Sequence, residues 1–152
     1  ISVLEGTEIV YILRVPTSQI MAINLAIGSR LPAWCSSMGR VLLAGLSDDA
    51  LSGVLAASAI TAHTRHTETS PAKLARAIAQ VRIDGHALVN QELEDGLCSI
   101  AVPLKDRAGN VIAAMNLSAN ANRVSAAQMT RKFLPPLKAA AARINQALAL
   151  RA

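Results

Sequence analysis

Residues 28–46, GSRLPAWCSSMGRVLLAGL, pass from a loop into a helix and constrain the fold more than any other stretch. A glycine and a proline near the start predict the loop, and apolar residues then recur at helical spacing. Ser36 and Ser37 lie between the two parts and are of the type that caps a helix N-terminus. Such a terminus favours anions, and Arg30 lies just upstream. We expect an anion site here, the alternative being a cap that binds only its own helix.

The length and composition favour one compact protein that binds neither single-stranded nucleic acid nor a membrane. A chain of 152 residues buries a core without disulfides. Its three aromatic residues, Tyr11, Trp34 and Phe133, are too few for a base-stacking surface. The net charge of +5 comes from basic residues spread at helical spacing, which is typical of solvated helix faces. No apolar run reaches the roughly 18 residues of a membrane helix.

The two cysteines, Cys35 and Cys98, belong to no CxxC or zinc-binding pattern. We interpret them as buried thiols of a cytoplasmic protein. A disulfide between them is the alternative.

Strand-like and helix-like segments are mixed without regular βαβ alternation. Expected strands cover residues 2–15 (with a break at Gly6-Thr7), 19–26, 86–91, 99–104 and 111–118, the last two joined by a DRAGN hairpin loop. Expected helices begin at serine caps at 36 or 37, 47, 70 and 125, and the last should kink or restart at Pro135-Pro136. The sum is an α+β fold with a central antiparallel β-sheet flanked by helices.

No catalytic constellation is visible, and we predict neither an enzyme nor a bound metal or cofactor. Three groups have side chains capable of chemistry: His63 with His66, Cys98 with His86, and the carboxylates Glu92, Glu94 and Asp95. The first lies in a Thr-rich loop without a third ligand. The second is better explained by a core thiol near an unrelated histidine, and the third by a solvated turn.

A small-molecule pocket is the better hypothesis. Asn116 and Ser118 alternate along an expected strand and therefore share a face. If buried, they need hydrogen-bond partners, which a ligand can supply; the alternative is a solvent-facing pair. Candidate apolar walls, which are equally candidates for ordinary core, are Ile20, Ile23, Leu31, Trp34, Met38 and Leu97.

Three segments together carry a family resemblance: residues 28–46, Gly85-His86 and residues 91–119, QELEDGLCSIAVPLKDRAGNVIAAMNLSA. They resemble the effector-binding domain of IclR-type transcriptional regulators, in the PcaR/PcaU/PobR-like branch that controls aromatic-acid degradation through the β-ketoadipate pathway. The resemblance covers residues 11–151. It implies a GAF-like or profilin-like fold and a single effector-binding and oligomerisation domain over residues 1–152. The family's winged helix-turn-helix DNA-binding domain would lie upstream, outside this chain.

The resemblance also implies which residues bind the effector. The matching polar positions are Ser37, Met38 through its backbone N–H, Gly39, Ser99, Asn116 and Ser118, and the matching apolar ones are Ile23, Leu31 and Leu97. Beyond the resemblance, side-chain chemistry suggests that Trp34 covers a ring face and that Arg14 or Arg30 pairs with a carboxylate. The alternative for Arg30 is a structural salt bridge away from the pocket. An acidic contact position in relatives falls at Val89 or Asn90 here; neither is acidic, which an anionic ligand tolerates.

The implied function is a sensor of a small aromatic acid, such as protocatechuate or 4-hydroxybenzoate, in a homodimer or homotetramer. DNA would be bound only through the missing domain. Effector binding would fix the pocket loop and its helix and so change the spacing of the DNA-binding domains. Alternatives are a GAF-like sensor of a short oxo-acid, a structural dimerisation module and, less favoured, an enzyme. Pocket volume separates the first from the main hypothesis, because two or three carbons need far less room than a ring.

Overall fold

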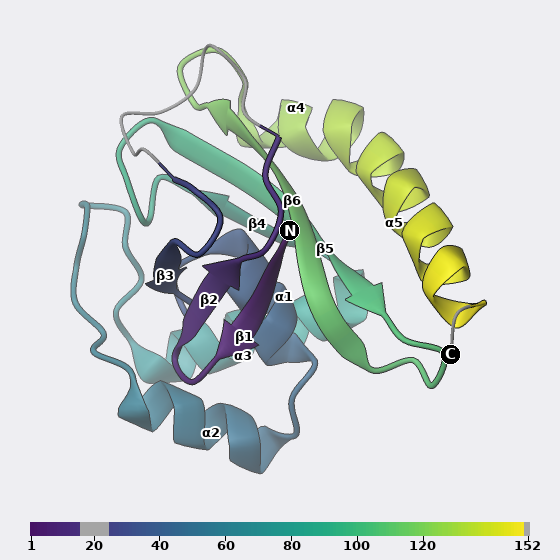
Figure 1. Ribbon diagram of the computed structural model, residues 1–152. Coiled ribbons are helices and arrows are strands. Elements are labelled where there is room, and N and C mark those ends of the chain that lie inside the picture. The colour runs from purple at the N-terminus through teal and green to yellow at the C-terminus, as the bar shows by residue number, and fades with distance from the viewer. Residues whose placement is uncertain (16–24, 151–152) are drawn as a thin grey trace.

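Six strands form one antiparallel sheet in the order β3-β2-β1-β6-β5-β4 (Figure 1). The structure, a computed structural model, describes residues 1–15 and 25–150. The strands are β1 (Ser2–Glu5), β2 (Glu8–Tyr11), β3 (Arg30–Pro32), β4 (Ala87–Asn90), β5 (Leu97–Lys105) and β6 (Val111–Asn120). The predicted antiparallel sheet is confirmed.

Helices cover both faces of this sheet. They are α1 (Ser37–Ala44), α2 (Asp48–Ala57), α3 (Pro71–Asp84), α4 (Ala126–Gln128), the π-helical turn η1 (Met129–Phe133) and α5 (Leu134–Ala149). Helix α1 packs on β5 and β6 with α3 behind it, whereas α5 runs along the other face of β5 and β6 (Figure 1). The α+β fold class predicted from the sequence is therefore confirmed.

Strand alternation divides the buried residues into two cores. On β5, Ala101 points toward the core of α1 and α3, while its neighbours Ile100 and Val102 point toward α5. The small Ala101 and Ala114 let α1 approach the sheet closely, and they lie in one core with the buried Leu43 of α1. Apolar side chains are thus buried on both faces of the central strands, which fixes their register.

The predicted helix starts are confirmed. Ser36, Ser47, Ser70 and Ser125 cap α1, α2, α3 and α4, each accepting a backbone N–H three residues on. The predicted restart near the two prolines also occurs, because η1 ends at Phe133 and α5 begins at Leu134. Both prolines then fall in the first turn of α5, directly after the π-helical turn, where the helical hydrogen-bond pattern changes.

Two segments differ from the expectation or lie beyond it. Residues Arg30–Pro32 were expected in a loop, but they form β3 and pair with β2. This strand is at the edge of the sheet, where one side needs no ladder partner, so its proline is tolerated. Most of the strand expected over residues 19–26 lies outside the described residues.

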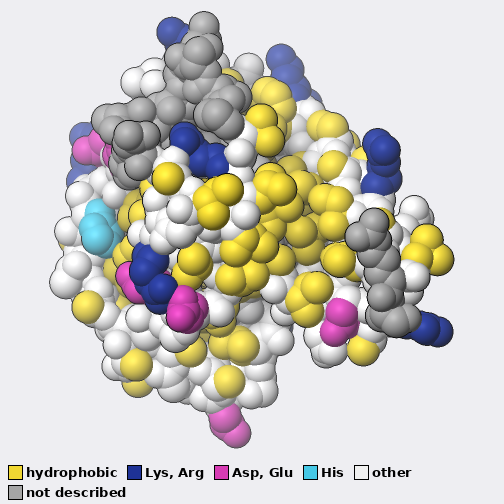
Figure 2. Space-filling model, viewed as in Figure 1, with side chains coloured by type: hydrophobic (Ala, Val, Ile, Leu, Met, Phe, Trp, Pro, Cys, Tyr) yellow, Lys and Arg dark blue, Asp and Glu magenta, His cyan; other side chains and the backbone are white. Residues whose placement is uncertain are grey.

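Strands β1 and β6 meet over a short distance. Their register pairs Ser2 with Ala114, whereas β6 continues beside β5 as far as Asn120. Over the described residues, the end of β6 therefore has a β-ladder partner on one side only. Figure 2 shows hydrophobic side chains gathered on this face between β1 and α5, where Ile1, Val3 and Met115 are partly exposed.

Candidate functional site

A cavity of about 530 Å³ lies where the start of α1, the end of β6 and the chain after β2 come together. Apolar side chains form most of its wall. The lining residues are Ile1, Ile9, Tyr11, Leu13, Arg14, Val15, Leu25, Leu31, Cys35, Ser36, Ser37, Met38, Val89, Leu93, Leu97, Ser99, Met115, Asn116, Leu117, Ser118 and Ile144. An apolar pocket of this size with a few polar groups is typical of small-molecule sites.

The first turn of α1 forms part of the cavity wall. Ser37 and Met38 both line the wall. Because they are the first two residues of the helix, their N–H groups have no intrahelical acceptor. The next N–H, of Gly39, is already bonded to Ser36 Oγ at 3.1 Å. The buried Ser37 hydroxyl accepts a hydrogen bond from Ser99 Oγ at 2.8 Å, which ties α1 to β5.

Strands β5 and β6 present three polar side chains to the same cavity. Ser99 pairs directly with Ser118, and Asn116 lies two residues before Ser118 on the same face. Asn116 Nδ2 donates to Ser118 Oγ at 3.2 Å. The sequence predicted that Asn116 and Ser118 share a face, and this is confirmed; both are half-buried on the cavity wall rather than on an outer surface.

The cavity reaches both faces of β6. Met115 and Leu117 point away from Asn116 by strand alternation, yet they also line it, together with Ile144 of α5. This follows from the short contact between β1 and β6, which leaves the end of β6 open on that side. The polar groups therefore lie on the α1 side and an apolar wall on the α5 side.

Charge in the cavity has one sign. Among the described lining residues, Arg14 is the one charged side chain, and none is acidic. The Arg14 guanidinium is half-buried and donates to the Leu25 carbonyl through Nη1. Burial raises the pKa of the neighbouring Tyr11 hydroxyl, and the positive charge of Arg14 partly opposes that rise. The site is therefore suited to an anion.

Several predicted site residues lie away from this cavity. Arg30 forms ion pairs with Glu5 at 2.6 Å and Glu8 at 2.7 Å on the outside of the sheet, the structural alternative considered above. Asn90 is exposed at the end of β4. Gly39 lies one residue beyond the lining, and Ile20 and Ile23 lie outside the described residues.

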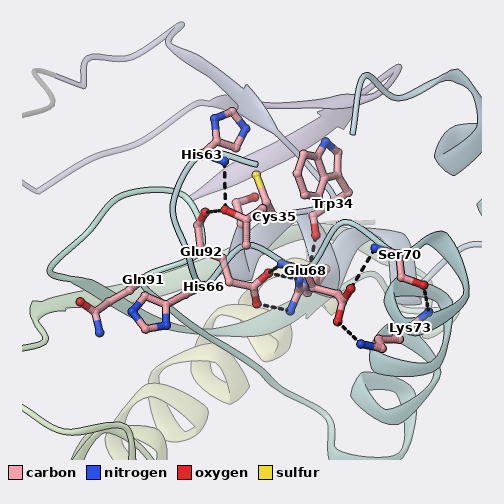
Figure 3. Close-up of polar contacts among 12 residues, drawn as sticks. Trp34, Cys35, His63, His66, Glu68, Ser70, Lys73, Gln91 and Glu92 are labelled. Atoms are coloured by element: carbon pink, nitrogen blue, oxygen red, sulfur yellow. Dashed lines mark hydrogen bonds and ion pairs between the residues drawn. The ribbon is translucent and has the colours of Figure 1, made fainter. Parts of the chain in front are cut away.

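Trp34 is also absent from the described cavity wall. Its ring is almost fully buried and stacks on His63, with centroids 5.8 Å apart and planes at 24° (Figure 3). Its side chain therefore lies against the loop of residues 61–69, which carries His63. We do not retain it as a ligand contact.

Glu92 corrects another expectation. It was interpreted as part of a solvated acidic turn, but only 13% of its side chain is exposed and it forms an ion pair with Arg40 at 2.7 Å. The partner lies 52 residues earlier in the chain. No local pattern around Glu92 predicts such a contact.

Other lining residues were missed from the sequence. Tyr11, Leu93, Met115 and Leu117 were not proposed, because each looks like an ordinary member of an apolar run. The one available signal was the pairing of 111–118 with 99–104, which would have placed Met115 and Leu117 on the face opposite Asn116. Only the short contact between β1 and β6 brings that face to the cavity.

Cys35 and Cys98 are both free and buried. Burial raises the pKa of the Cys35 thiol to about 12, and burial also raises that of Cys98. A thiol with an ordinary pKa near 8.5 is partly ionised at pH 8, so iodoacetamide should label folded Cys35 at least ~100-fold more slowly than the urea-unfolded chain. Mass spectrometry of timed samples checks this. Labelling at equal rates would contradict it.

The same pKa shift gives a pH dependence of stability. Below about pH 8.5 the Cys35 thiol is protonated in both the folded and the unfolded chain, so its ionisation does not reduce the free energy of unfolding. Above that pH the unfolded chain releases a proton that the folded chain retains up to about pH 12, so the free energy of unfolding falls as pH rises. Urea unfolding at pH 8 and pH 10 should show a smaller fall for Cys35→Ala than for the parent.

The described residues contain neither a candidate metal-binding cluster nor a candidate membrane-spanning helix. Over 1–15 and 25–150, no group of three His, Cys, Asp or Glu side chains could hold a metal ion. None of the helices in these two ranges combines the length and apolarity that crossing a membrane requires.

Comparison with known proteins identifies the family. Residues 1–146 match the domain described as "Bacterial transcriptional regulator IclR C-terminal". The chain is 45% identical to the Pca regulon regulatory protein of Pseudomonas putida over 138 residues, which covers 90% of this chain and 47% of that protein. A putative transcriptional regulator from Rhodococcus sp. RHA1 has the same fold, with a TM-score of 0.94, 44% identity, and coverage of 99% of this chain and 62% of that one.

A further solved relative carries a ligand. It is a double mutant of the inducer-binding domain of the transcription factor PobR from Acinetobacter, in complex with 3-hydroxybenzoic acid. The TM-score is 0.86 at 28% identity, with coverage of 95% of this chain and 85% of that one. The relatives are transcriptional regulators rather than enzymes, which confirms that prediction.

This chain spans about half the length of the curated relatives that it matches. The six-stranded antiparallel sheet, the cavity at the start of α1 and the match over residues 1–146 agree with one another. The chain belongs to the IclR family of bacterial transcriptional regulators and corresponds to their C-terminal, ligand-binding domain.

Proposed function

We propose that residues 1–152 form one effector-binding and oligomerisation domain that senses a hydroxylated aromatic carboxylate, such as protocatechuate or 4-hydroxybenzoate. The observation that carries the proposal is the polarity of the cavity. Arg14 is the one charged side chain on its described wall, and the first two residues of α1, whose N–H groups lack intrahelical acceptors, line the same space. This combination favours an anion over a neutral or cationic ligand.

The proposed ligand uses three parts of the wall. Its carboxylate accepts hydrogen bonds from the N–H groups of Ser37 and Met38, with the charge of Arg14 adding attraction. Its ring packs against the apolar side chains around Leu31 and Leu97. Its hydroxyl groups bond to Asn116 and Ser118, two of the few polar side chains on a mostly apolar wall.

The size of the cavity favours a ring over a short oxo-acid. About 530 Å³ lies within the range of small-molecule pockets and has room for a substituted ring, whereas a molecule of two or three carbons needs far less room. The polar lining disfavours a purely structural dimerisation module, since such a module needs no buried donors beside a hollow.

Two relatives support the same ligand class. The P. putida relative is named as the regulator of the Pca regulon, and the PobR inducer-binding domain was solved with a hydroxybenzoic acid. From these relatives we infer that the protein regulates aromatic-acid degradation, that it binds DNA through an upstream domain, and that it forms a homodimer or homotetramer. Effector binding would shift the arrangement of α1 and its preceding loop, a coupling of about 1–3 kcal/mol.

Titration calorimetry tests the ligand class. Protocatechuate, 4-hydroxybenzoate and 3-hydroxybenzoate should bind and raise the melting temperature, while pyruvate and glyoxylate should not. The neutral 4-hydroxybenzamide should bind about 10- to 100-fold more weakly than 4-hydroxybenzoate, because it loses a charge-assisted interaction of about 1.5–3 kcal/mol. Absence of both heat and thermal shift for every aromatic acid would refute the proposal.

Asn116→Ala tests the site with a matched control. Removing the amide should weaken 4-hydroxybenzoate binding about 5- to 100-fold and reduce the preference for it over benzoate, because a ligand hydroxyl loses its partner. Asn90→Ala removes the same amide from an exposed strand end off the described cavity wall and should leave the affinity unchanged. Equal affinities of the two variants would contradict the proposed roles.

A further inference from the structure

Arg40 is a buried cation on α1 that does not line the cavity. Only 7% of its side chain is exposed. Nε donates to the Trp34 carbonyl at 2.9 Å, and Nη1 and Nη2 donate to the two carboxylate oxygens of Glu92 at 2.9 and 2.7 Å. The guanidinium therefore joins the segment that precedes α1 to the segment between β4 and β5.

Glu92 extends this connection to a third segment (Figure 3). Its Oε2 also accepts the N–H of Glu68 at 3.1 Å, and its carbonyl accepts Thr67 Oγ1 at 2.6 Å. Thr64 Oγ1 donates to the carbonyl of Gln91 at 2.6 Å. The loop of residues 61–69, which stacks on Trp34 through His63, is thus fastened to the same ion pair.

The backbone beside Glu92 is held in an unusual conformation. Gln91 has φ of +62°, the one non-glycine residue with positive φ among residues 1–15 and 25–150. Such a conformation costs energy unless its surroundings fix it. Here the side-chain oxygen of Gln91 accepts a hydrogen bond from the Gly96 N–H at 3.0 Å. The backbone N–H of Gln91 donates to the Leu97 carbonyl at 2.6 Å. These two hydrogen bonds of Gln91 therefore fix the conformation of the turn that carries Glu92.

Each residue of the Arg40–Glu92 pair lies close in sequence to a residue that lines the cavity. Met38, two residues before Arg40, and Leu93, directly after Glu92, both line the cavity. An ion pair at this place contributes little net stability, because desolvation offsets most of the attraction. Its directed hydrogen bonds, however, fix the relative position of the segments, which an apolar contact does less strictly.

We propose that Arg40 and Glu92 are positioning residues that hold the first turn of α1 and the β4–β5 segment in the arrangement that binds the effector. This rests on the proposed function only for the identity of the ligand. A protein that spends part of its time in an arrangement unable to bind loses affinity in proportion to that fraction. Weakening the pair should therefore lower effector affinity without removing a single ligand contact.

Three variants separate positioning from stability. Arg40→Lys keeps the charge but loses the two-oxygen geometry, and Glu92→Gln places an amide donor against a guanidinium donor. The double variant Arg40→Met with Glu92→Leu replaces the pair by apolar side chains, which commonly preserves folding. The control is Arg82→Lys, because Arg82 also donates to two carbonyls, of Ala44 and Leu46, and to one carboxylate, of Asp48, but lies off this cavity.

Three measurements are made on the parent and on each variant: urea unfolding, calorimetry with protocatechuate and 4-hydroxybenzoate, and fluorescence of Trp34, the single tryptophan. We expect the folded Arg40 and Glu92 variants to bind at least 10-fold more weakly, with Trp34 emission shifted to longer wavelength. Arg82→Lys should change neither. The double variant should regain stability but not affinity, which a merely structural pair would not produce.

The outcomes separate the two proposals. If the parent binds and the folded variants bind equally well, the positioning role is overturned while the proposed function stands. If the parent binds none of the aromatic acids, the proposed function fails, and Trp34 emission with hydrogen exchange at the first turn of α1 decides the positioning role. Unchanged emission and exchange in the variants would then overturn it.

Discussion

Replacing Gly39 with alanine is expected to destabilise the protein by about 3 kcal/mol or more, because overpacking at a rigid contact cannot relax. Helix α1 crosses the chain so closely at Gly39 that an added Cβ would overlap the carbonyl oxygen, Cα and carbonyl carbon of Ala33, inside the 3.0 Å that such atoms essentially never cross. All three are backbone atoms, so no side-chain rotation removes the overlap. Urea unfolding monitored by circular dichroism measures the loss.

Gly53→Ala is the matched control for this variant. Gly53 also lies inside a helix, α2, but a Cβ there would meet nothing within 4 Å. Alanine in an open helical position is favoured over glycine, so this change should stabilise the protein by roughly 0.5–1 kcal/mol. If the Gly39 and Gly53 variants unfolded at the same urea concentration, the close approach of α1 to Ala33 would be wrong.

Truncating Glu92 to alanine is expected to cost about 3–5 kcal/mol of stability, the second large effect. The guanidinium of Arg40 would remain buried with two of its donors unpaired, and the Glu68 N–H would lose its acceptor. The penalty comes mainly from stranding a charge away from water, rather than from the net value of the ion pair. Urea unfolding measures this loss. The double variant that combines Glu92→Ala with Arg40→Met should recover most of it, because no buried charge is then left without a partner.

Glu8→Ala provides the comparison with an exposed pair. Glu8 pairs with Arg30 at 2.7 Å, close to the Glu92 distance, but both side chains are more than 40% exposed. Water and salt compensate for a missing partner at such a site, so the change should cost less than about 1 kcal/mol. Similar costs for the Glu8 and Glu92 variants would contradict the burial of the Arg40 pair.

The local architecture could be predicted because its determinants are adjacent in the sequence. A serine followed by helical periodicity marked the starts of the four capped helices, and DRAGN marked the hairpin between β5 and β6. The short edge strand at Arg30–Pro32 was not predictable in this way, because glycine and proline signals dominate these three residues, and within residues 1–15 and 25–150 they form a ladder with β2 alone.

The site could be predicted in part for the same reason. Asn116 and Ser118 stand out as polar residues on an apolar strand, and their common face follows from a period of two. The direction of Trp34 and the partner of Glu92 depend on contacts with residues that are distant in the sequence, at positions 63 and 40. Periodicity, capping and turn chemistry carry no information on such long-range pairs. For this reason the buried carboxylate of Glu92 was interpreted as a solvated one.

The single residue pair between β1 and β6 has a consequence for how this sheet responds to an occupant. It makes the sheet two three-stranded halves, β3-β2-β1 and β6-β5-β4, joined along a narrow seam. Ile9 and Tyr11 belong to one half, and Ser99 and Asn116 to the other, yet all four line the same cavity. A molecule that fills the cavity touches both halves at once, so its binding free energy includes that of locking one half against the other.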